Sequence, residues 1–277
     1  MKPAEFQYHK PATVADAVQL LHELGDGAKV IAGGQSLLPI MNLRLAEPSH
    51  LVDITGIPEL RRSEVVGSAG HYGAATTHMM VEDGLVPDVT GGLLAHAAGG
   101  IGYRAIRTRG TLGGSLAHAD SSAEWPTVMS AVDAVVTAAS VRGTRRIPVR
   151  KLLFGFFTTA LEPDELIISV EVPAFSSNVR WALHKTARKP GEFAESMAVV
   201  LRRPTGSELW LGAARDTPVR LGTTETAVHT RPAADIPLAE LVEAVAADTD
   251  CEGHTLQLHA VTVQRALRAA EREEIHA

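Results

Sequence analysis

The sequence predicts an α+β fold, in which strands and helices occupy separate stretches of the chain. One observation is the amphipathic helical pattern of TVADAVQLLHELG (residues 13–25), which is followed by the short apolar strand KVIA. A second is the alternation of apolar and polar residues in ELIISVEVP (165–173), which is typical of a half-buried strand. A third is the order within residues 179–277, where strand patterns come first and helical patterns last.

The elements of the first half of the chain follow from local signals. Thr13 is a suitable N-cap for the first helix, and Gly25 ends it. HLVDI (50–54) is expected to form a strand. Residues 84–102 are small and apolar on all sides, which predicts a buried helix.

The second half continues the pattern. Residues 124–140 change from a helical to a strand pattern. MAVVLRR (197–203) and LWLGAAR (209–215) are predicted to be strands, and residues 236–248 and 258–273 are predicted to be helices. Between the two halves, a stretch rich in proline, serine and asparagine near residues 173–178 is expected to be a linker.

Bulk composition excludes several classes of protein. The chain has 277 residues and a formal net charge of -6, which argues against a nucleic-acid-binding protein because phosphate contacts need a basic face. Its single cysteine, Cys251, allows neither an internal disulfide nor a cysteine-ligated iron–sulfur cluster held by this chain alone. No signal peptide and no run of about 18 apolar residues is evident, so we expect a cytoplasmic protein without a membrane span.

Two glycine pairs stand in similar surroundings, in AGGQSL (the first glycine loop, residues 32–37) and TLGGS (the second glycine loop, residues 111–115). A glycine pair lets the backbone adopt positive φ and lets a ligand approach, so that successive N–H groups can converge on an anion. Ser36, Thr111 and Ser115 could add hydroxyl donors. Each loop alone could equally be an ordinary turn, whereas two matching loops could hold the two sides of one diphosphate.

Other phosphate and catalytic motifs are absent. There is no G-x-x-x-x-G-K-[ST], no G-x-G-x-x-G that opens a helix after a strand, no G-x-S-x-G elbow and no H-E-x-x-H. The sequence therefore disfavours P-loop, Rossmann, α/β-hydrolase and zincin sites. We expect no catalytic nucleophile and no metal site on this chain.

Taken with their flanks, the two loops resemble a known family. Residues 32–54 and 105–128, together with 157–173, 185–194 and 212–221, are similar to the FAD-binding medium subunits of molybdenum hydroxylases. These include the flavoprotein subunits of aerobic carbon monoxide dehydrogenase and nicotine dehydrogenase and, more distantly, the flavin domain of xanthine dehydrogenase.

The resemblance implies a particular α+β architecture. Residues 1–175 would form an FAD-binding domain of the type shared with vanillyl-alcohol oxidase and the muramate-forming reductase (PCMH-type), with subdomains at about 1–55 and 56–175. Residues 179–277 would form a small C-terminal α+β domain of the carbon monoxide dehydrogenase flavoprotein type. The cofactor would be FAD, with its diphosphate held between the loops by Ala32, Gly33, Gly34, Gln35, Ser36 and Leu37 on one side and by Thr111, Gly113, Gly114 and Ser115 on the other.

Further cofactor contacts are implied one position at a time. Glu124 matches an acid that accepts hydrogen bonds from ribityl or ribose hydroxyls, although its type alone fits a solvated surface residue equally well. Asp120 would lie beside the flavin or else stabilise a turn. Ile101 and Ile167 would pack on the adenine and near the flavin ring, or simply belong to the core. Lys185 matches a cation near the isoalloxazine, where it would favour the anionic reduced form.

Histidines show no metal-ligand spacing. His118 is the one next to the implied site and is a candidate to contact FAD or its surroundings. For His71, His78 and His96 we expect structural or surface roles.

The implied function is that of an FAD-carrying electron-transfer subunit. Substrate would be hydroxylated at a molybdenum cofactor on a large subunit, and electrons would pass through [2Fe–2S] clusters of a small subunit to FAD and then to an external acceptor. The assembly would be a dimer of heterotrimers, a heterohexamer. The alternative is a stand-alone FAD-dependent oxidoreductase acting directly on a small molecule. The sequence identifies neither the substrate nor the acceptor.

Overall fold

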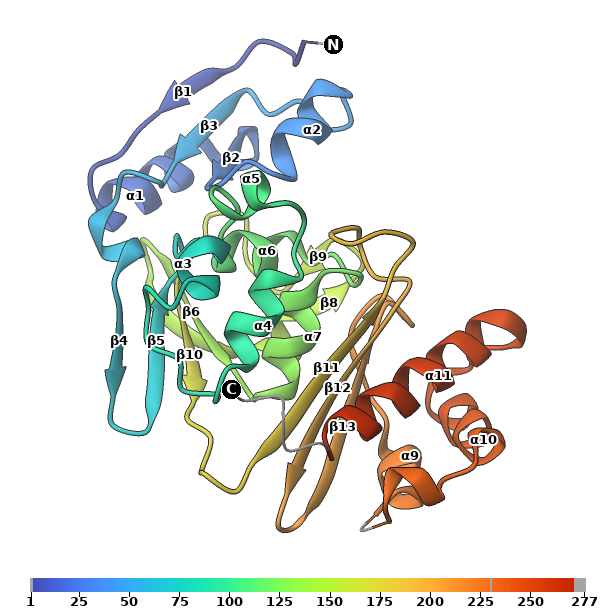
Figure 1. Ribbon diagram of the computed structural model, residues 1–277. Coiled ribbons are helices and arrows are strands. Elements are labelled where there is room, and N and C mark those ends of the chain that lie inside the picture. Colours follow the sequence, from blue (N-terminus) through green and yellow to red (C-terminus); the bar gives the residue numbers. More distant parts are fainter. Residues whose placement is uncertain (1, 230, 272–277) are drawn as a thin grey trace.

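The computed structural model describes residues 2–229 and 231–271. Within these residues the strands form a three-stranded, a five-stranded and a four-stranded sheet, together with one two-stranded ribbon. Figure 1 shows the three sheets following one another from the N-terminal end to the C-terminal helices. The fold is therefore a mixed helix and sheet structure, as the sequence predicts.

The N-terminal lobe is built around a parallel sheet of order β1-β3-β2. Helix α1 packs on it through the apolar face formed by Ala17, Val18 and Leu21. The Thr13 hydroxyl caps this helix by accepting from the Asp16 N–H, and Gly25 ends it with φ 56°, which confirms both predicted signals. The elements of the lobe are β1 (Gln7–His9), α1 (Val14–Leu24), β2 (Ala28–Ile31), α2 (Leu37–Asn42) and β3 (His50–Asp53).

The middle of the chain forms an antiparallel sheet of order β4-β5-β10-β6-β7. Helices α4, α6 and α7 pack beside it and contribute the fully buried Trp125. The elements are β4 (Ser63–Val66), β5 (Ala69–Gly73), α3 (His78–Glu82), α4 (Leu93–Gly99), α5 (Arg104–Arg107), α6 (Leu112–His118), α7 (Glu124–Ala131), β6 (Val135–Ser140), β7 (Gly143–Pro148), α8 (Val149–Leu152), β8 (Leu153–Gly155), β9 (Thr158–Thr159) and β10 (Leu166–Pro173).

The C-terminal part is an antiparallel sheet of order β11-β12-β13-β14. One face is covered by α11 and α10, as Figure 1 shows, while Val199, Leu201 and Trp210 on the other face join the core of the middle part. The elements are β11 (Arg180–Thr186), β12 (Ser196–Arg203), β13 (Gly206–Gly212), β14 (Val219–Arg220), α9 (Gly222–Ala227), α10 (Leu238–Thr249) and α11 (Gly253–Ala269).

Some predicted boundaries are wrong. The buried helix expected over 84–102 is confined to α4, because Pro87 and the positive φ of Gly91 and Gly92 interrupt the chain before Leu93. The last helix begins at Gly253 rather than at 258, and residues 272–273 of that prediction lie outside the described residues. Helix α2, directly after the first glycine loop, was not predicted.

Candidate functional site

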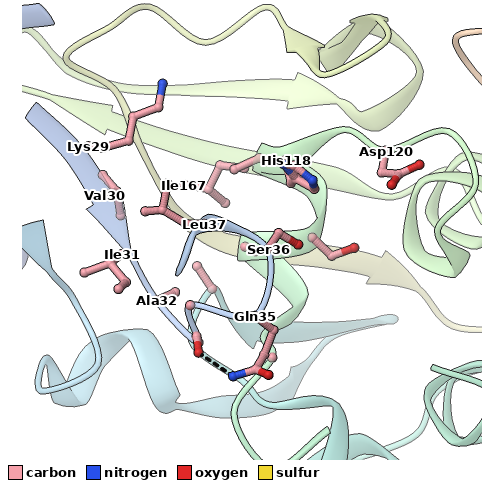
Figure 2. A pocket seen from close by; sticks show the side chains of 18 of the residues that line it. Lys29, Val30, Ile31, Ala32, Gln35, Ser36, Leu37, His118, Asp120 and Ile167 are labelled. Carbon is pink, nitrogen blue, oxygen red and sulfur yellow. Dashed lines mark hydrogen bonds between the residues drawn. The ribbon is translucent and has the colours of Figure 1, made fainter. Parts of the chain in front are cut away.

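The main cavity of the described residues has a volume of about 800 Å³. It is lined by the first glycine loop and strand β2, by α6 with part of the second glycine loop, by strand β10 and by the loop at 191–193. Figure 2 shows Ser36 and Leu37 of the first loop between the strand that carries Lys29–Ile31 and the helix that carries His118. The cavity is within the size range of small-molecule and cofactor sites, roughly 300–1,000 Å³.

The first glycine loop is an open bend between β2 and α2. Gly34 has φ 72°, a left-handed conformation that favours glycine. The Gln35 side-chain amide donates to the carbonyl of Gly33 at 3.1 Å, which braces the bend and is drawn in Figure 2. The carbonyls of Gly34 and Ser36 accept from Leu38 and Ile40 of the following helix.

The backbone N–H groups of residues 33–37 have no hydrogen-bond acceptor among the described residues. All five residues line the cavity. Buried or half-buried backbone donors are almost always paired with protein, water or a ligand. A run of consecutive unpaired N–H groups on a cavity wall is therefore a donor surface suited to an anion.

The second glycine loop is organised differently. Thr111 caps helix α6 by accepting from the Gly114 N–H, and the Gly113 N–H donates to the carbonyl of Ala74 at 2.9 Å. The Leu112 and Ser115 N–H groups donate to the carbonyls of Thr76 and Thr111. The expectation that amides of both loops grip one diphosphate is thus wrong for residues 112–115 of the second loop, whose amides are already bonded within the protein.

The two loops nevertheless meet, as the sequence predicts. A Cβ added to Gly33 would lie 2.0 Å from the carbonyl oxygen of Arg109 and 2.8 Å from the Cα of Gly110, so the backbones are in direct contact there. A Cβ added to Gly114 would lie 3.8 Å from the Cβ of Ala32. The second loop therefore supports the first by close packing that only glycine at position 33 allows.

Most residues singled out from the sequence line this cavity, and two do not. Those on its wall are Ala32, Gly33, Gly34, Gln35, Ser36, Leu37, Ile101, Gly113, Gly114, Ser115, His118, Asp120, Glu124 and Ile167. Thr111 is buried as a helix cap, and Lys185 lies behind Glu124.

Lys185 is fully engaged within the protein. Its ammonium group donates to the carboxylate of Glu124 at 2.6 Å and to the carbonyls of Gly100 at 2.7 Å and Glu192 at 3.0 Å. These three acceptors occupy all the donors of an ammonium group. The expectation of a cation near the isoalloxazine stays a prediction. In the structure this cation is paired with Glu124 of the cavity wall, and Lys185 joins strand β11 to the helices of the middle part.

Glu124 is buried at the start of helix α7, with 4% of its surface exposed. Burial raises the pKa of its carboxyl group, and the ion pair with Lys185 opposes that rise. The ammonium group of Lys185 donates to one carboxylate oxygen, Oε1, so the other remains able to accept from a hydroxyl group in the cavity.

His118 and Asp120 frame the end of helix α6. The His118 ring stacks on Phe157 with centroids 4.7 Å apart, and burial lowers the pKa of the imidazole, so it is neutral at pH 7. Asp120 lines the cavity and also accepts from the Ser122 N–H at 2.9 Å, so it stabilises a turn as the alternative interpretation held.

Sequence reasoning missed several residues of the cavity wall. Lys29 lines the cavity from β2, just before the first loop; a charged residue within an apolar strand was the signal. Phe157 and Glu162 come from the segment before β10, which carries no recognisable motif. His78 was assigned a structural role, but it also reaches the cavity.

Comparisons with known proteins agree with this geometry. Residues 4–175 match the family described as the FAD binding domain in molybdopterin dehydrogenase. The chain is 39% identical over 207 residues to the carbon monoxide dehydrogenase medium chain of Hydrogenophaga pseudoflava, which covers 75% of this chain and 72% of that protein. It is 31% identical to the caffeine dehydrogenase subunit beta of a Pseudomonas species, over 98% of this chain and 97% of that protein.

Solved structures extend the likeness to the whole fold. A carbon monoxide dehydrogenase from Hydrogenophaga pseudoflava that lacks the Mo-pyranopterin moiety superposes with a TM-score of 0.89 at 34% identity, covering 98% of each chain. Reconstituted CO dehydrogenase from Oligotropha carboxidovorans gives a TM-score of 0.90 at 29% identity, covering 98% of this chain and 100% of that one.

The fold and cavity define a cofactor-binding oxidoreductase chain rather than a nucleic-acid or structural protein. The chain belongs to the family of FAD-binding domains of molybdopterin dehydrogenases. Its cofactor is FAD, and the relatives are chains of multi-subunit oxidoreductases. Within the described residues no helix is long and apolar enough to cross a membrane, and no group of three or more metal-ligating side chains is found.

Proposed function

We propose that this chain is the FAD-carrying electron-transfer subunit of a molybdenum hydroxylase. It would receive electrons from [2Fe–2S] clusters of a partner subunit and deliver them to an external acceptor. The observation that carries the proposal is the run of unpaired backbone N–H groups at residues 33–37 on the wall of a cavity of about 800 Å³. The chain's single cysteine requires that any cysteine-ligated cluster reside on another polypeptide.

The residues present fit the cofactor. The first glycine loop would hold the diphosphate through its backbone donors, and Glu124 would accept from a sugar or ribityl hydroxyl through Oε2. Ile101 and Ile167 supply apolar walls for the ring systems. When bound, FAD accepts and releases electrons singly or in pairs, so the chain needs no nucleophile or general base of its own.

The sheets support the proposed division of the chain. The parallel sheet of β1, β2 and β3 lies within residues 1–55, the five-stranded sheet within 56–175 and the four-stranded sheet within 179–277. We assign these to the two PCMH-type subdomains and the C-terminal domain. The large and small partners would complete a dimer of heterotrimers.

Native co-purification with metal analysis tests the function. Molybdenum and iron should accompany FAD in stoichiometric amounts, and the isolated chain should bind FAD yet not oxidise the substrate of the complex. Substrate turnover by the isolated chain, without molybdenum or iron, would instead establish the stand-alone flavoenzyme. That alternative is not favoured, because the reported relatives are medium chains or subunits of larger enzymes.

A further inference from the structure

The two glycine loops differ in the donors that they leave for a ligand. The first loop presents N–H groups without an acceptor among the described residues, whereas the amides of residues 112–115 donate to carbonyls and a hydroxyl within the protein. An anion in the cavity is best stabilised when donors surround it. A side chain near the contact between the two loops is therefore the place to look for a further donor.

His78 lies at this contact. It is the first residue of helix α3, is 5% exposed and lines the cavity. The indole N–H of Trp125 donates to Nδ1 of His78 at 3.0 Å. Because an indole N–H can only donate, Nδ1 must be unprotonated, and the neutral ring then carries its hydrogen on Nε2. Trp125 thus fixes the tautomer that makes Nε2 a donor.

The neutral form of His78 is well supported at physiological pH. Burial lowers the pKa of the imidazole to about 4, and the nearby positive charge of Arg107 acts in the same direction. The ring is therefore an uncharged donor at pH 7. Protonation of Nδ1 would break the bond from Trp125.

Nε2 of His78 has no hydrogen-bond partner among residues 2–229 and 231–271, yet it is not among the unpaired polar atoms that the protein encloses completely. A Cβ added to Gly110 would lie 2.7 Å from Nε2 and 2.8 Å from Cδ2, so this edge of the imidazole packs against the glycine, where a larger residue would displace it. Gly110 also packs against Gly33, since a Cβ added to Gly33 would lie 2.8 Å from the Cα of Gly110. The donor therefore stands beside the junction of the two glycine loops.

We infer that His78 donates a hydrogen bond from Nε2 to a phosphate oxygen of the flavin nucleotide, with Trp125 as the positioning residue that holds its tautomer. This inference rests on FAD binding in the cavity, as the proposed function requires. The sequence pattern predicts that backbone amides of the second loop donate to the diphosphate. In this inference the side chain of His78, from α3, is the donor instead.

A matched pair of variants tests the inference. In His78→Asn, the side-chain carbonyl can still accept from Trp125, but no donor remains at the position of Nε2. In His78→Gln, the longer amide can place an N–H near that position. By fluorescence titration we expect the Kd for FAD to rise about tenfold in the Asn variant and by less than about threefold in the Gln variant, since hydrogen bonds to charged groups are the stronger ones. Equal unfolding temperatures without FAD would show that both variants fold.

Wild-type affinity in the Asn variant, or equal losses in both variants, would overturn the inference. A measurement on the wild-type chain keeps the test valid if a variant does not fold. With ¹⁵N-labelled histidine, NMR should show protonated Nε2 and unprotonated Nδ1 in His78, and FAD should shift the Nε2 resonance while riboflavin, which lacks phosphate, should not. An unprotonated Nε2, or no response to FAD, would contradict it.

These outcomes are separate from those of the proposed function. If wild-type protein binds FAD and His78→Asn binds it equally well, only the role of His78 fails. If the native chain carries FAD but no molybdenum or iron partner, the electron-transfer function fails and the role of His78 stands.

Discussion

The two glycine loops look alike in sequence but do different work in the structure. In the first loop the N–H groups of residues 33–37 have no acceptor within the part of the chain that the structure describes, and these residues line the cavity. In the second loop the N–H groups of residues 112–115 are bonded to Ala74, Thr76 and Thr111, so the loop forms the capped start of helix α6. A glycine pair can therefore mark either a donor surface or a close backbone contact, and only the hydrogen bonds distinguish the two cases.

This comparison divides the expected effects of mutation into two kinds. Changes in the first loop should lower the affinity for FAD. Changes in the second loop should instead lower the stability of the chain itself. A variant whose effect falls on the wrong side of this division would contradict it.

Gly33→Ala should have the largest effect, because Gly33 belongs to the donor surface of the first loop and also makes the close backbone contact with Arg109 and Gly110. Its Cβ would lie 2.0 Å from the carbonyl oxygen of Arg109, a backbone atom that cannot move aside cheaply. We expect purified protein to lack flavin absorbance and to show more than about 100-fold weaker binding of added FAD. Gly222→Ala is the control, since a Cβ there meets nothing within 4 Å and the residue has no positive φ. Normal flavin content in the Gly33 variant would refute the close contact.

Lys185→Met should act mainly on stability. It leaves the carboxylate of Glu124 buried without its cation, and breaking a buried ion pair from one side costs about 3–5 kcal/mol. Urea unfolding of the FAD-free chain should show this loss. The double variant Lys185→Met, Glu124→Gln should recover part of it, because no buried charge remains. A loss of FAD affinity without a loss of stability would restore the idea of Lys185 as a cation beside the flavin.

The pH dependence of stability should report on His78. The unfolded chain takes up a proton at this residue as pH falls below about 6.5, whereas the folded chain does so only near its pKa of about 4. The unfolded state therefore binds more protons in this window, and stability falls as pH falls from 6.5 to 4, by about 3 kcal/mol for this group. Other buried histidines add to this fall in stability. The measurement is therefore the free energy of unfolding in urea, compared between wild type and His78→Asn at pH 7 and at pH 4.5. Parallel curves would show that His78 is protonated in the folded state.

Gly34→Ala should weaken FAD binding with little change elsewhere. The φ of 72° costs a residue with a Cβ about 1–2 kcal/mol, and the bend that aims the N–H groups at the cavity would relax. We expect affinity to fall about tenfold in fluorescence titrations, while the unfolding temperature of the FAD-free chain changes by only a few degrees. The opposite pattern, lost stability with retained affinity, would mean that the first loop is only a turn.

Thr111→Val should have the smallest effect on the cofactor. It removes the N-cap of helix α6, which costs about 1 kcal/mol of stability. Because the threonine hydroxyl is bonded to Gly114 and lies away from the cavity wall, FAD affinity should change by less than about threefold. A large loss of affinity would show that Thr111 contacts the diphosphate after all.

Much of the fold could be predicted from the sequence, and the reasons are local. Thr13 and Gly25 mark the ends of α1, and the alternation in residues 165–173 corresponds to strand β10. The starts of α4 and α11 were placed wrongly, because glycines at 91, 92 and 253 with positive φ act as boundaries that hydrophobic periodicity does not reveal.

The sequence predicted most of the residues that line the cavity, but it did not predict their hydrogen bonds. The glycine pairs indicated that two distant segments meet, and they do. The acceptors that occupy the second loop, at Ala74 and Thr76, belong to a segment far away in the sequence, so their pairing with Gly113 and Leu112 could not be derived from the motif. The contacts of Lys185 could not be derived for the same reason, since its partners Gly100 and Glu124 come from other elements.

Hydrogen exchange at single-residue resolution, with and without FAD, measures which backbone N–H groups of the two loops bind the cofactor. The N–H groups of residues 33–37 should exchange rapidly in the FAD-free chain and become protected when FAD binds, while those of residues 112–115 should be protected in both states. Exchange at residues 33–37 that FAD leaves unchanged, or fast exchange at 112–115 that FAD slows, would contradict the account.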